Sequence, residues 1–405
     1  MIVKLENTPR DYAWGSTTLM ADVLGIASTG APMAEVWFGT HQGSPARVHG
    51  MTGKTLFELR GSKSLGFLLK FLAAELPLSI QVHPSRPKAL AGFTRESELG
   101  LDIQSSARSY KDENPKSESL VAITEFEVMA GIREEAEAKA ALEQLATAVP
   151  NNLKTLERLI DRAATDSDSL FSVLLGADSD FDSADLDALT SELAASLTNP
   201  EGEEQAFLAR LASVFGADRG VLVAVLMKRF TLQPGQALVV PPGTPHSYVS
   251  GLGLEIQDNS DNVLRAGLTE KKVDAVEFLD VLDVETSKEL QVLEPREILN
   301  GLELYPNISE DYCLHRIEVT GENLLADIGL PGDSILVCVA GEIAIGDSLG
   351  NREVLRRGEA AYIQNEAKFY SISGSGTGYL GHLDGRLCPM VATRCHVSTD
   401  GLHAS

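Results

Sequence analysis

The first 130 residues contain short apolar runs that are interrupted by glycine and proline. Three of these runs are Ala34–Gly39, Leu76–Pro84 and Leu120–Ile123. Apolar runs of this length between turn residues are typical of β-strands. For Gly66–Glu75 the periodicity does not distinguish a strand from a short helix. The pattern predicts a region at the N-terminal end that is built mainly from strands.

The pattern changes between residues 131 and 230, where Ala, Leu, Glu and Arg dominate. Leu142 and Leu145 are spaced as on a helix, and the same period continues in Leu153–Ile160 and in Leu186–Leu193. Apolar residues three to four positions apart line one face of a helix. We therefore expect an inserted α-helical subdomain over this part of the chain.

Strand and turn signals return after residue 231. The turns Pro234-Gly235 and Pro241-Pro242-Gly243 flank the apolar run Ala237–Val240, and further short runs follow at Ile335–Val339 and Ile343–Ile345. Short strands with Gly and Pro turns fit a jelly roll. The expected fold class is mainly β, with two cupin-like jelly-roll barrels and the helical insertion. The expected boundaries are 1–130 and 231–290 for the first barrel, 131–230 for the insertion and 291–405 for the second barrel.

The charge of the chain narrows the choice of partners. Its 405 residues include 34 Lys and Arg against 58 Asp and Glu, so the net charge is 34 − 58 = −24. Such a charge argues against nucleic acid or an anionic membrane as the main partner. Residues 1–130 are nearly neutral, with 13 basic and 14 acidic side chains. An anionic small molecule could therefore be bound in this part of the chain.

The sequence also bears on the cellular compartment. Its first residues lack the apolar segment of a signal peptide, and no run of 18 apolar residues is present. The four cysteines, Cys313, Cys338, Cys388 and Cys395, show no CxxC spacing. We expect a soluble cytoplasmic protein with reduced thiols.

Several polar residues recur at strand spacing. Gln81 and His83 are two positions apart in a strand-like run, and Lys116 and Glu118 repeat this interval before the next run. Side chains at i and i+2 share one face of a strand. With His246 farther along the chain, these residues offer the donors of a divalent-metal site that keeps open positions. A lone His after a strand is more often a structural hydrogen-bonding residue than a ligand, and spacing alone also allows Lys116 and Glu118 to be a solvated surface pair.

Four longer motifs relate the chain to a known protein family. The segments Tyr12–Ser16, Leu78–Pro84, Pro241–Tyr248 and Asp258–Thr269 follow one another in an order and spacing that resembles the type I phosphomannose isomerases. These are zinc-dependent, cupin-fold enzymes that interconvert mannose 6-phosphate and fructose 6-phosphate and are usually monomeric. One block departs from the family pattern. The family's Asn-His-Lys-Pro-Glu reads Asn-Pro-Lys-Ser-Glu here, at residues 114–118.

The resemblance implies a role for each matching residue. The ligands of one zinc ion per chain would be Gln81, His83, Glu118 and His246. Arg265, Glu255 and Lys116 would be the catalytic residues, with Glu255 as the candidate base. Lys116, Arg265, Tyr248 and His41 are the candidates for substrate binding.

The chemistry of the expected reaction suits these residues. Moving a proton between C1 and C2 through a cis-enediolate needs a base of tuned pKa and stabilisation of a negative oxygen. Arg265 and Lys116 could each bind the 6-phosphate or stabilise the enediolate oxygen. The expected function is mannose-6-phosphate isomerase, which feeds mannose into glycolysis or into activated donors such as GDP-mannose.

Three alternatives stay open at this point. The altered block at residues 114–118 leaves room for an isomerase of another phosphosugar or of a free aldose. A non-catalytic cupin that binds metal or sugar is the alternative from a different class. An iron-dependent dioxygenase fits less well, because such enzymes use two histidines and one carboxylate, without a Gln ligand.

Overall fold

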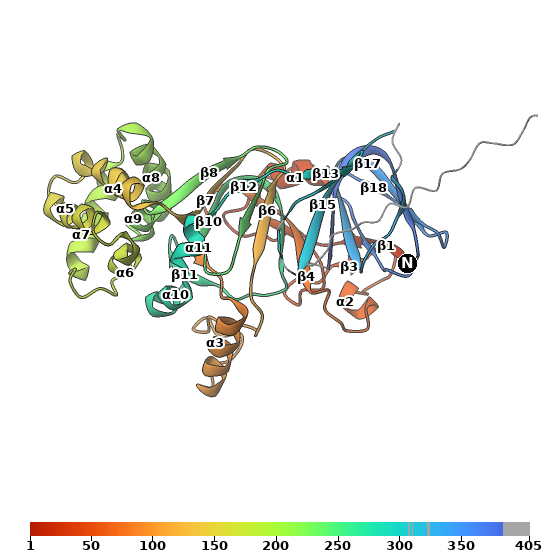
Figure 1. Ribbon diagram of the computed structural model, residues 1–405, viewed down its shortest axis with the longest axis horizontal. Helices are drawn as coiled ribbons and strands as arrows, with labels where there is room; N and C mark the ends of the chain where they lie inside the picture. The colour runs from red at the N-terminus through yellow and green to blue at the C-terminus, as the bar shows by residue number, and fades with distance from the viewer. Residues whose placement is uncertain (307, 310, 322–324, 384–405) are drawn as a thin grey trace, which may run out of the picture.

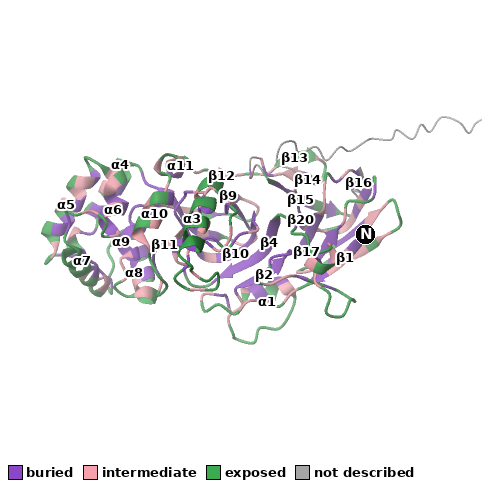
Figure 2. Cartoon of the chain, turned by 90° about the horizontal axis from the view of Figure 1, so that it is seen from below, coloured by how far each residue is buried: buried purple, intermediate pink, exposed green. Residues whose placement is uncertain are grey.

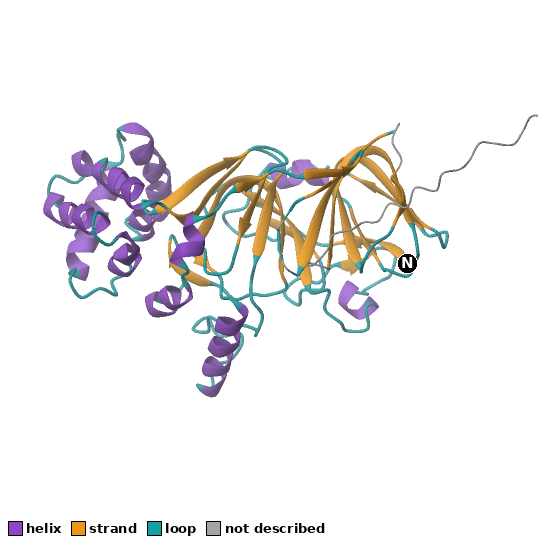
Figure 3. Ribbon diagram, viewed as in Figure 1, coloured by secondary structure: helices purple, strands orange, loops and turns teal. Residues whose placement is uncertain are grey.

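The computed structural model describes residues 1–306, 308–309, 311–321 and 325–383 (Figure 1). The described strands form two ten-stranded sheets, in which neighbouring strands run antiparallel. Most helices lie at one end of the molecule, and the sheet that contains β1 and β15 to β20 lies at the other end (Figure 3). The chain is therefore mainly β, as the pattern predicts. Within the described residues, no helix combines the length and apolar character that a membrane span requires.

The sheet in the middle of the molecule, here called the central sheet, carries the candidate residues. Its strands are β2 (Glu35–Phe38), β4 (Phe67–Ala74), β5 (Ile80–Val82), β6 (Glu118–Ala122), β7 (Phe126–Ile132), β8 (Met227–Leu232), β9 (Ala237–Val240), β10 (His246–Asp258), β11 (Leu264–Gly267) and β12 (Val292–Leu293). The three apolar runs predicted as strands near the N-terminus are β2, β5 and β6. The ambiguous run Gly66–Glu75 contains β4.

The other sheet, here called the terminal sheet, combines both ends of the described chain. Its strands are β1 (Ile2–Glu6), β3 (Arg47–Val48), β13 (Arg296–Leu299), β14 (Leu302–Leu304), β15 (Tyr312–Thr320), β16 (Leu325–Ile328), β17 (Ser334–Asp347), β18 (Arg352–Arg356), β19 (Ala360–Ile363) and β20 (Tyr370–Leu383). The first strand, β1, pairs with β19, more than 350 residues along the chain. No pattern of local hydrophobicity could signal this pairing.

Two of the helices, α1 and α2, precede β4, and α3 lies apart from the others in Figure 1. Helices α4 to α9 form the group at one end, and α10 and α11 follow β11. The α-helices are α1 (Leu19–Leu24), α2 (Leu56–Leu59), α3 (Arg86–Glu98), α4 (Glu135–Glu143), α5 (Leu153–Ala163), α6 (Leu170–Leu174), α7 (Ser183–Ser196), α8 (Gly202–Phe215), α9 (Gly220–Ala224), α10 (Ala275–Val281) and α11 (Val284–Lys288). Two 3₁₀ turns occur at Ala146–Ala148 and Ser167–Ser169.

The outer face of the central sheet packs into two apolar cores. Ile80 and Val82 of β5 pack into the apolar core of helices α4 to α9. Phe71 of β4 and Ile256 of β10 pack into a second core shared with the terminal sheet. Because side chains alternate along a strand, Gln81 (between Ile80 and Val82) and Lys70 (between Leu69 and Phe71) point to the inner face. Figure 2 shows the resulting burial along β4 and β10.

A β-bulge in β10 changes which residues face inward. Tyr248 pairs with Val128 of β7, whereas Ser250 pairs with the adjacent Glu127, so β10 contains one extra residue at this point. A shift by one residue moves all following side chains to the opposite face. As a result, even-numbered residues face inward before the bulge and odd-numbered ones after it. Gly251, directly after the bulge, has a φ of 128°.

The cysteines correct one expectation. Cys338 is a buried free thiol, as expected. Cys313 of β15 is disulfide-bonded, so the expectation of reduced thiols is wrong for this residue. A search for CxxC spacing detects only cysteines that are neighbours in sequence, and this chain has no such pair. Cys388 and Cys395 lie outside the described residues.

The bulge predicts a strict requirement for glycine at position 251. A Cβ there would lie 2.6 Å from the carbonyl oxygen of Glu125, and φ is positive. We expect Gly251→Ala to lower the free energy of unfolding by about 3 kcal/mol through the clash and the backbone strain. Chemical denaturation measures this. Gly235→Ala is the matched control, because its φ is also positive but no atom lies within 4 Å of its Cβ. An equal loss in both variants would contradict the clash at the bulge.

A second prediction concerns His315 and His382, which are fully buried and stacked with ring centroids 5.1 Å apart. Burial and the neighbouring His382 lower the pKa of His315 to about 3. The unfolded chain binds a proton near pH 6.5, so stability is intact above this pH and falls as the pH drops toward 3. Between pH 7.5 and pH 5 the loss from His315 is about 2 kcal/mol. Denaturant midpoints measured at both pH values should show that His315→Phe loses less stability between them than the unmodified protein does. An equal loss of stability in both proteins would contradict this account.

Candidate active site

Three potential metal ligands meet on the inner face of the central sheet. His83 follows β5, Glu118 opens β6 and His246 opens β10. One ligand atom from each lies within 4.8 Å of the other two, and all three residues are buried. His246 Nε2 is 2.8 Å from Glu118 Oε1, and His83 Nε2 is 3.2 Å from Glu118 Oε2. The structure thus brings together three of the four predicted ligands, although they lie up to 163 residues apart in sequence (246 − 83).

Both imidazoles are held in the orientation that a metal ligand requires. His83 Nδ1 is 2.8 Å from the carbonyl oxygen of Asn262, and His246 Nδ1 is 3.0 Å from that of Thr244. A backbone carbonyl accepts a hydrogen bond from Nδ1–H, and this contact turns Nε2 of each ring toward Glu118. Burial, with Lys116 nearby, lowers the pKa of His83 to about 3, so this ring is neutral.

Glu118 supplies the charge of this group. Burial alone would raise the pKa of its carboxyl, but Lys116, His246 and His83 more than offset this effect and hold the pKa well below its usual value. The carboxylate is therefore ionised at neutral pH. Two imidazoles and one carboxylate form a donor set that suits a divalent transition metal such as zinc.

Gln81 lies beside this group, on the same face of the sheet. It pairs with His246 of β10 on one side and with Arg265 of β11 on the other. Residues directly opposite each other on neighbouring strands point to the same face. Gln81 is half-buried, and its Nε2 donates to Ser79 Oγ at 3.2 Å. The register therefore places Gln81 and Arg265 in one row with His246.

Lys116 reaches into the donor group. Its Nζ is 2.7 Å from Glu118 Oε2 and 2.9 Å from His83 Nε2. The block that departs from the family pattern keeps this lysine in place through two contacts. Ser117 N donates to Asp258 Oδ2 at 2.8 Å, and the side chain of Asn262 donates to the carbonyl oxygen of Asn114 at 2.9 Å.

A chain of buried polar groups leads away from Glu118. The hydroxyl of Tyr248 lies 3.0 Å from Glu118 Oε1 and 3.3 Å from Glu255 Oε1. Glu255 Oε2 lies 2.6 Å from Lys70 Nζ. Burial raises the pKa of Glu255 to about 7; Lys70 opposes this rise, and Glu118 adds to it. Glu255 is thus poised to take up and release a proton near neutral pH.

Lys70 and its second partner Glu35 were not predicted from the sequence. Lys70 Nζ lies 3.3 Å from Glu35 Oε1. Burial lowers the pKa of Lys70, but the carboxylates of Glu255 and Glu35 outweigh this effect and raise the pKa above its usual value. The sequence does contain a signal that could have identified both residues. Lys70 is the one charged residue in the apolar run Phe67–Ala74, and Glu35 starts the strand-like run of β2. A charge in an otherwise apolar strand indicates a buried partner.

These groups line one cavity of about 970 Å³. Its wall includes eight of the nine candidate residues: His41, Gln81, Lys116, Glu118, His246, Tyr248, Glu255 and Arg265. The ninth, His83, contacts the wall through Lys116 and Glu118. His41 packs edge-on against Trp37, and its Nε2 lies 3.4 Å from Asp261 Oδ2. The structure therefore gathers all candidate residues around one space.

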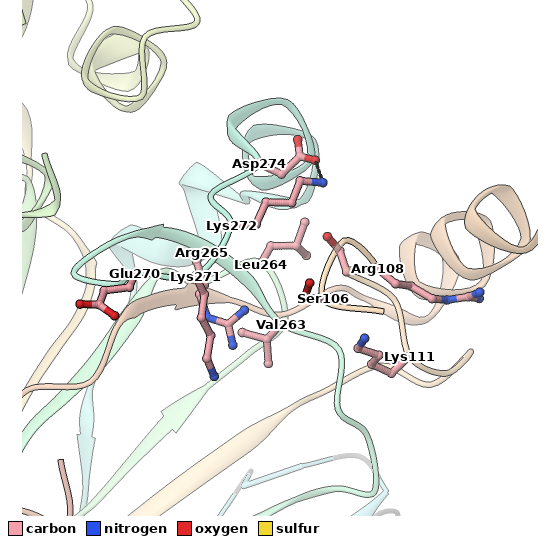
Figure 4. Close-up of a pocket in the computed structure, with 11 residues that line it drawn as sticks. Ser106, Arg108, Lys111, Val263, Leu264, Arg265, Glu270, Lys271, Lys272 and Asp274 are labelled. Carbon is pink, nitrogen blue, oxygen red and sulfur yellow. Dashed lines mark ion pairs between the residues drawn. The ribbon is translucent and has the colours of Figure 1, made fainter. Parts of the chain in front are cut away.

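A smaller cavity of about 520 Å³ adjoins the first and shares Arg265, Lys111 and Lys271 with it. Figure 4 shows the side chains of Arg265 and Lys271 pointing in the same direction. Burial lowers the pKa of both groups, and Arg265 lowers that of Lys271 further. In a chain of net charge −24, such a cluster of cations favours an anionic ligand at this end of the cavity.

Known proteins share this chain's sequence and fold. The family model for the catalytic domain of type I phosphomannose isomerase matches residues 2–135. Mannose-6-phosphate isomerase of Salmonella typhimurium is 32% identical over 411 residues, which cover 95% of this chain and all of that protein. The Escherichia coli enzyme of the same name is 31% identical, over 92% of this chain and 97% of its own length.

A solved structure agrees with the sequence comparison. The crystal structure of a zinc-bound mannose 6-phosphate isomerase superposes with a TM-score of 0.82 at 29% identity, and the match covers 95% of this chain and 99% of that one. The match therefore extends well beyond residues 2–135, which the catalytic-domain model matches. The chain therefore belongs to the type I phosphomannose isomerase family.

Proposed function

We propose that this protein is a zinc-dependent mannose-6-phosphate isomerase, which interconverts mannose 6-phosphate and fructose 6-phosphate. The observation that carries the proposal is the convergence of His83, Glu118 and His246 in a cavity that also holds a buried carboxyl group and a cluster of cations. Relatives of that name match nearly the whole chain. The substrate is a small phosphosugar.

The residues that would hold the metal are His83, Glu118, His246 and Gln81. The fit rests on the two Nε2 atoms that face the Glu118 carboxylate and on the position of Gln81 in the adjacent row. One carboxylate leaves a Zn²⁺ ion with a net charge near +1, and a zinc ion bound there supplies Lewis-acid stabilisation to a sugar oxygen.

Glu255 is the proposed base. Its carboxyl group faces the cavity, and its pKa near 7 lets it remove a proton from C2 of the aldose and return it to C1. Tyr248 orients this carboxyl through Oε1. Lys116, beside the metal ligands, is placed to stabilise the negative oxygen of the enediolate.

Arg265 is the proposed phosphate ligand. It lies at the end of the cavity where Lys111 and Lys271 also line the wall. Guanidinium groups bind phosphate oxygens through two parallel hydrogen bonds, and the lysines add point charges. The row of Gln81 and Arg265 would then place the sugar between its phosphate site and the metal. His41 lines the same cavity from the side of Trp37.

The remaining parts of the proposal concern architecture and setting. We propose that the two sheets are cupin-like jelly-roll barrels, with residues 1–130 and 231–290 mainly in the first, 291–405 mainly in the second and 131–230 as a helical insertion. Three strands depart from these bounds: β1 and β3 pair within the terminal sheet, and β12 pairs within the central sheet. We further propose a monomeric enzyme of the cytoplasm that acts without nucleic acid or membrane and supplies GDP-mannose synthesis.

Metal removal tests the function. Conversion of mannose 6-phosphate to fructose 6-phosphate, followed by a coupled assay, should stop after EDTA treatment and return with zinc, because the enediolate then regains its stabilisation. Elemental analysis should find about one zinc per chain. His83→Ala should lose the metal, whereas the exposed His49→Ala is the control that keeps it. Turnover that survives complete chelation would overturn the proposal. Zinc binding with turnover of another phosphosugar or of free mannose would redefine the substrate, and zinc binding without any turnover would indicate a binding protein.

Removal of the base gives a second test. We expect Glu255→Gln to lower kcat by about 10²- to 10⁴-fold, because the amide cannot accept the proton, while zinc content stays the same. In the unmodified enzyme the active form carries the ionised carboxylate, so kcat/KM should fall as the pH drops through about 7. Steady-state kinetics between pH 5.5 and 9 measure both effects. A variant with near-normal kcat would remove Glu255 from the mechanism.

A further inference from the structure

One ammonium group is shared by two buried carboxylates beside the proposed base. Lys70 Nζ lies 2.6 Å from Glu255 Oε2 and 3.3 Å from Glu35 Oε1. The exposed fractions of Lys70, Glu35 and Glu255 are only 6%, 6% and 1%. Water therefore screens these charges little, and each group strongly affects the others.

The strand register fixes this arrangement. Lys70 of β4 pairs with Glu255 of β10 on one side and with Trp37 of β2 on the other. Glu35 lies two residues before Trp37 on the same face, and its Oε2 accepts a hydrogen bond from Trp37 Nε1 at 2.9 Å. One carboxylate oxygen of Glu35 is thus anchored by the indole, and the other is directed at the ammonium group.

The charges that face Glu255 come from several elements. They are Lys70 of β4 and Glu118 and Lys116 from β6 and the loop before it, together with the hydroxyl of Tyr248. Glu35 contacts Lys70, the group that lies between it and Glu255. Lys116 is engaged by Glu118 at 2.7 Å, so Lys70 is the cation in direct contact with Glu255. The basicity of Glu255 therefore depends on how strongly the Lys70 ammonium group stabilises its ionised carboxylate.

We propose that Glu35 is a positioning residue for the isomerisation. Glu35 shares the ammonium group of Lys70 with Glu255 and thereby keeps Glu255 a strong enough base to remove the proton from the sugar. This inference rests on the proposed role of Glu255. Without the negative charge of Glu35, Lys70 would form an exclusive ion pair with Glu255. The carboxylate would then be stabilised in its ionised form and would take up a proton less readily.

The test is Glu35→Gln, which keeps the shape of the side chain but removes its charge. We expect kcat to fall about tenfold, KM to change less than threefold, and the acidic limb of the kcat/KM profile to move about one pH unit lower. Glu35→Asp, which keeps the charge, should recover much of kcat and return the limb toward its normal position. A normal kcat in Glu35→Gln, or a lowered kcat with an unmoved limb, would overturn the proposal.

Glu204→Gln is the matched control for the loss of a buried carboxylate. Glu204 Oε2 accepts from Arg133 and Arg229 at 2.9 and 3.0 Å, and the residue is as buried as Glu35, but it lies on α8, outside the cavity. We expect this variant to lower the denaturant midpoint and leave the pH profile in place. A shift of its acidic limb equal to that of Glu35→Gln would show that the shift reports lost stability, and would overturn the positioning role.

A titration without substrate separates this inference from the proposed function. The δ-carbon of ¹³C-labelled glutamate, assigned to Glu255 by its absence in Glu255→Gln, reports ionisation of that carboxyl in the resting protein. In Glu35→Gln the Glu255 carboxyl should titrate at a lower pH than in the unmodified protein, whether or not mannose 6-phosphate is turned over. An unchanged titration would overturn the coupling, whereas a shifted titration in a protein without isomerase activity would overturn only the reaction assigned to it.

Discussion

The β-bulge in β10 is the constraint on which the site depends, because one strand must supply both ends of the cavity wall. His246 and Tyr248 face inward before the bulge, and Glu255 and Gln257 face inward after it. A regular strand would present even-numbered or odd-numbered residues to the cavity, never both. The extra residue at positions 249–250 therefore joins the metal-ligand end of the cavity to the end that holds the buried carboxyl group. The positive φ of Gly251 is part of the same local geometry.

Charge pairing explains why so many ionisable groups can share this interior. Each buried charge has a partner within hydrogen-bond distance: Glu118 contacts Lys116, and Lys70 contacts Glu255. The His83 ring adds no charge, because burial and the nearby Lys116 lower its pKa to about 3, and its Nδ1 lies against a backbone carbonyl. An ion pair that lost one member here would leave an uncompensated charge, which is far more costly than at the surface. The interior thus behaves as one electrostatic unit, in which a change at one residue alters its neighbours.

Much of the central sheet could be predicted from the sequence. Short apolar runs indicated β2, β5 and β6, and the interval between Gln81 and His83 indicated a shared face. The resemblance to a family was needed to connect these residues with His246, since no local pattern links positions so far apart. Lys70 and Glu35 were missed because their partners lie on neighbouring strands, where pairing depends on register. The same limit applies to β1, which joins the terminal sheet.

The packing of helices α4 to α9 has a consequence for how the protein could be simplified. These helices are not an appendage on a complete sheet, because Ile80 and Val82 of β5 and Leu264 of β11 are built into their apolar core. The inner side chains of the same two strands, Gln81 and Arg265, face the cavity. A shortened chain without the helices would expose an apolar strand face to water and leave it prone to self-association. Any minimal version of this enzyme must therefore keep a cover over β5 and β11, even though the described residues of helices α4 to α9 do not line the cavity.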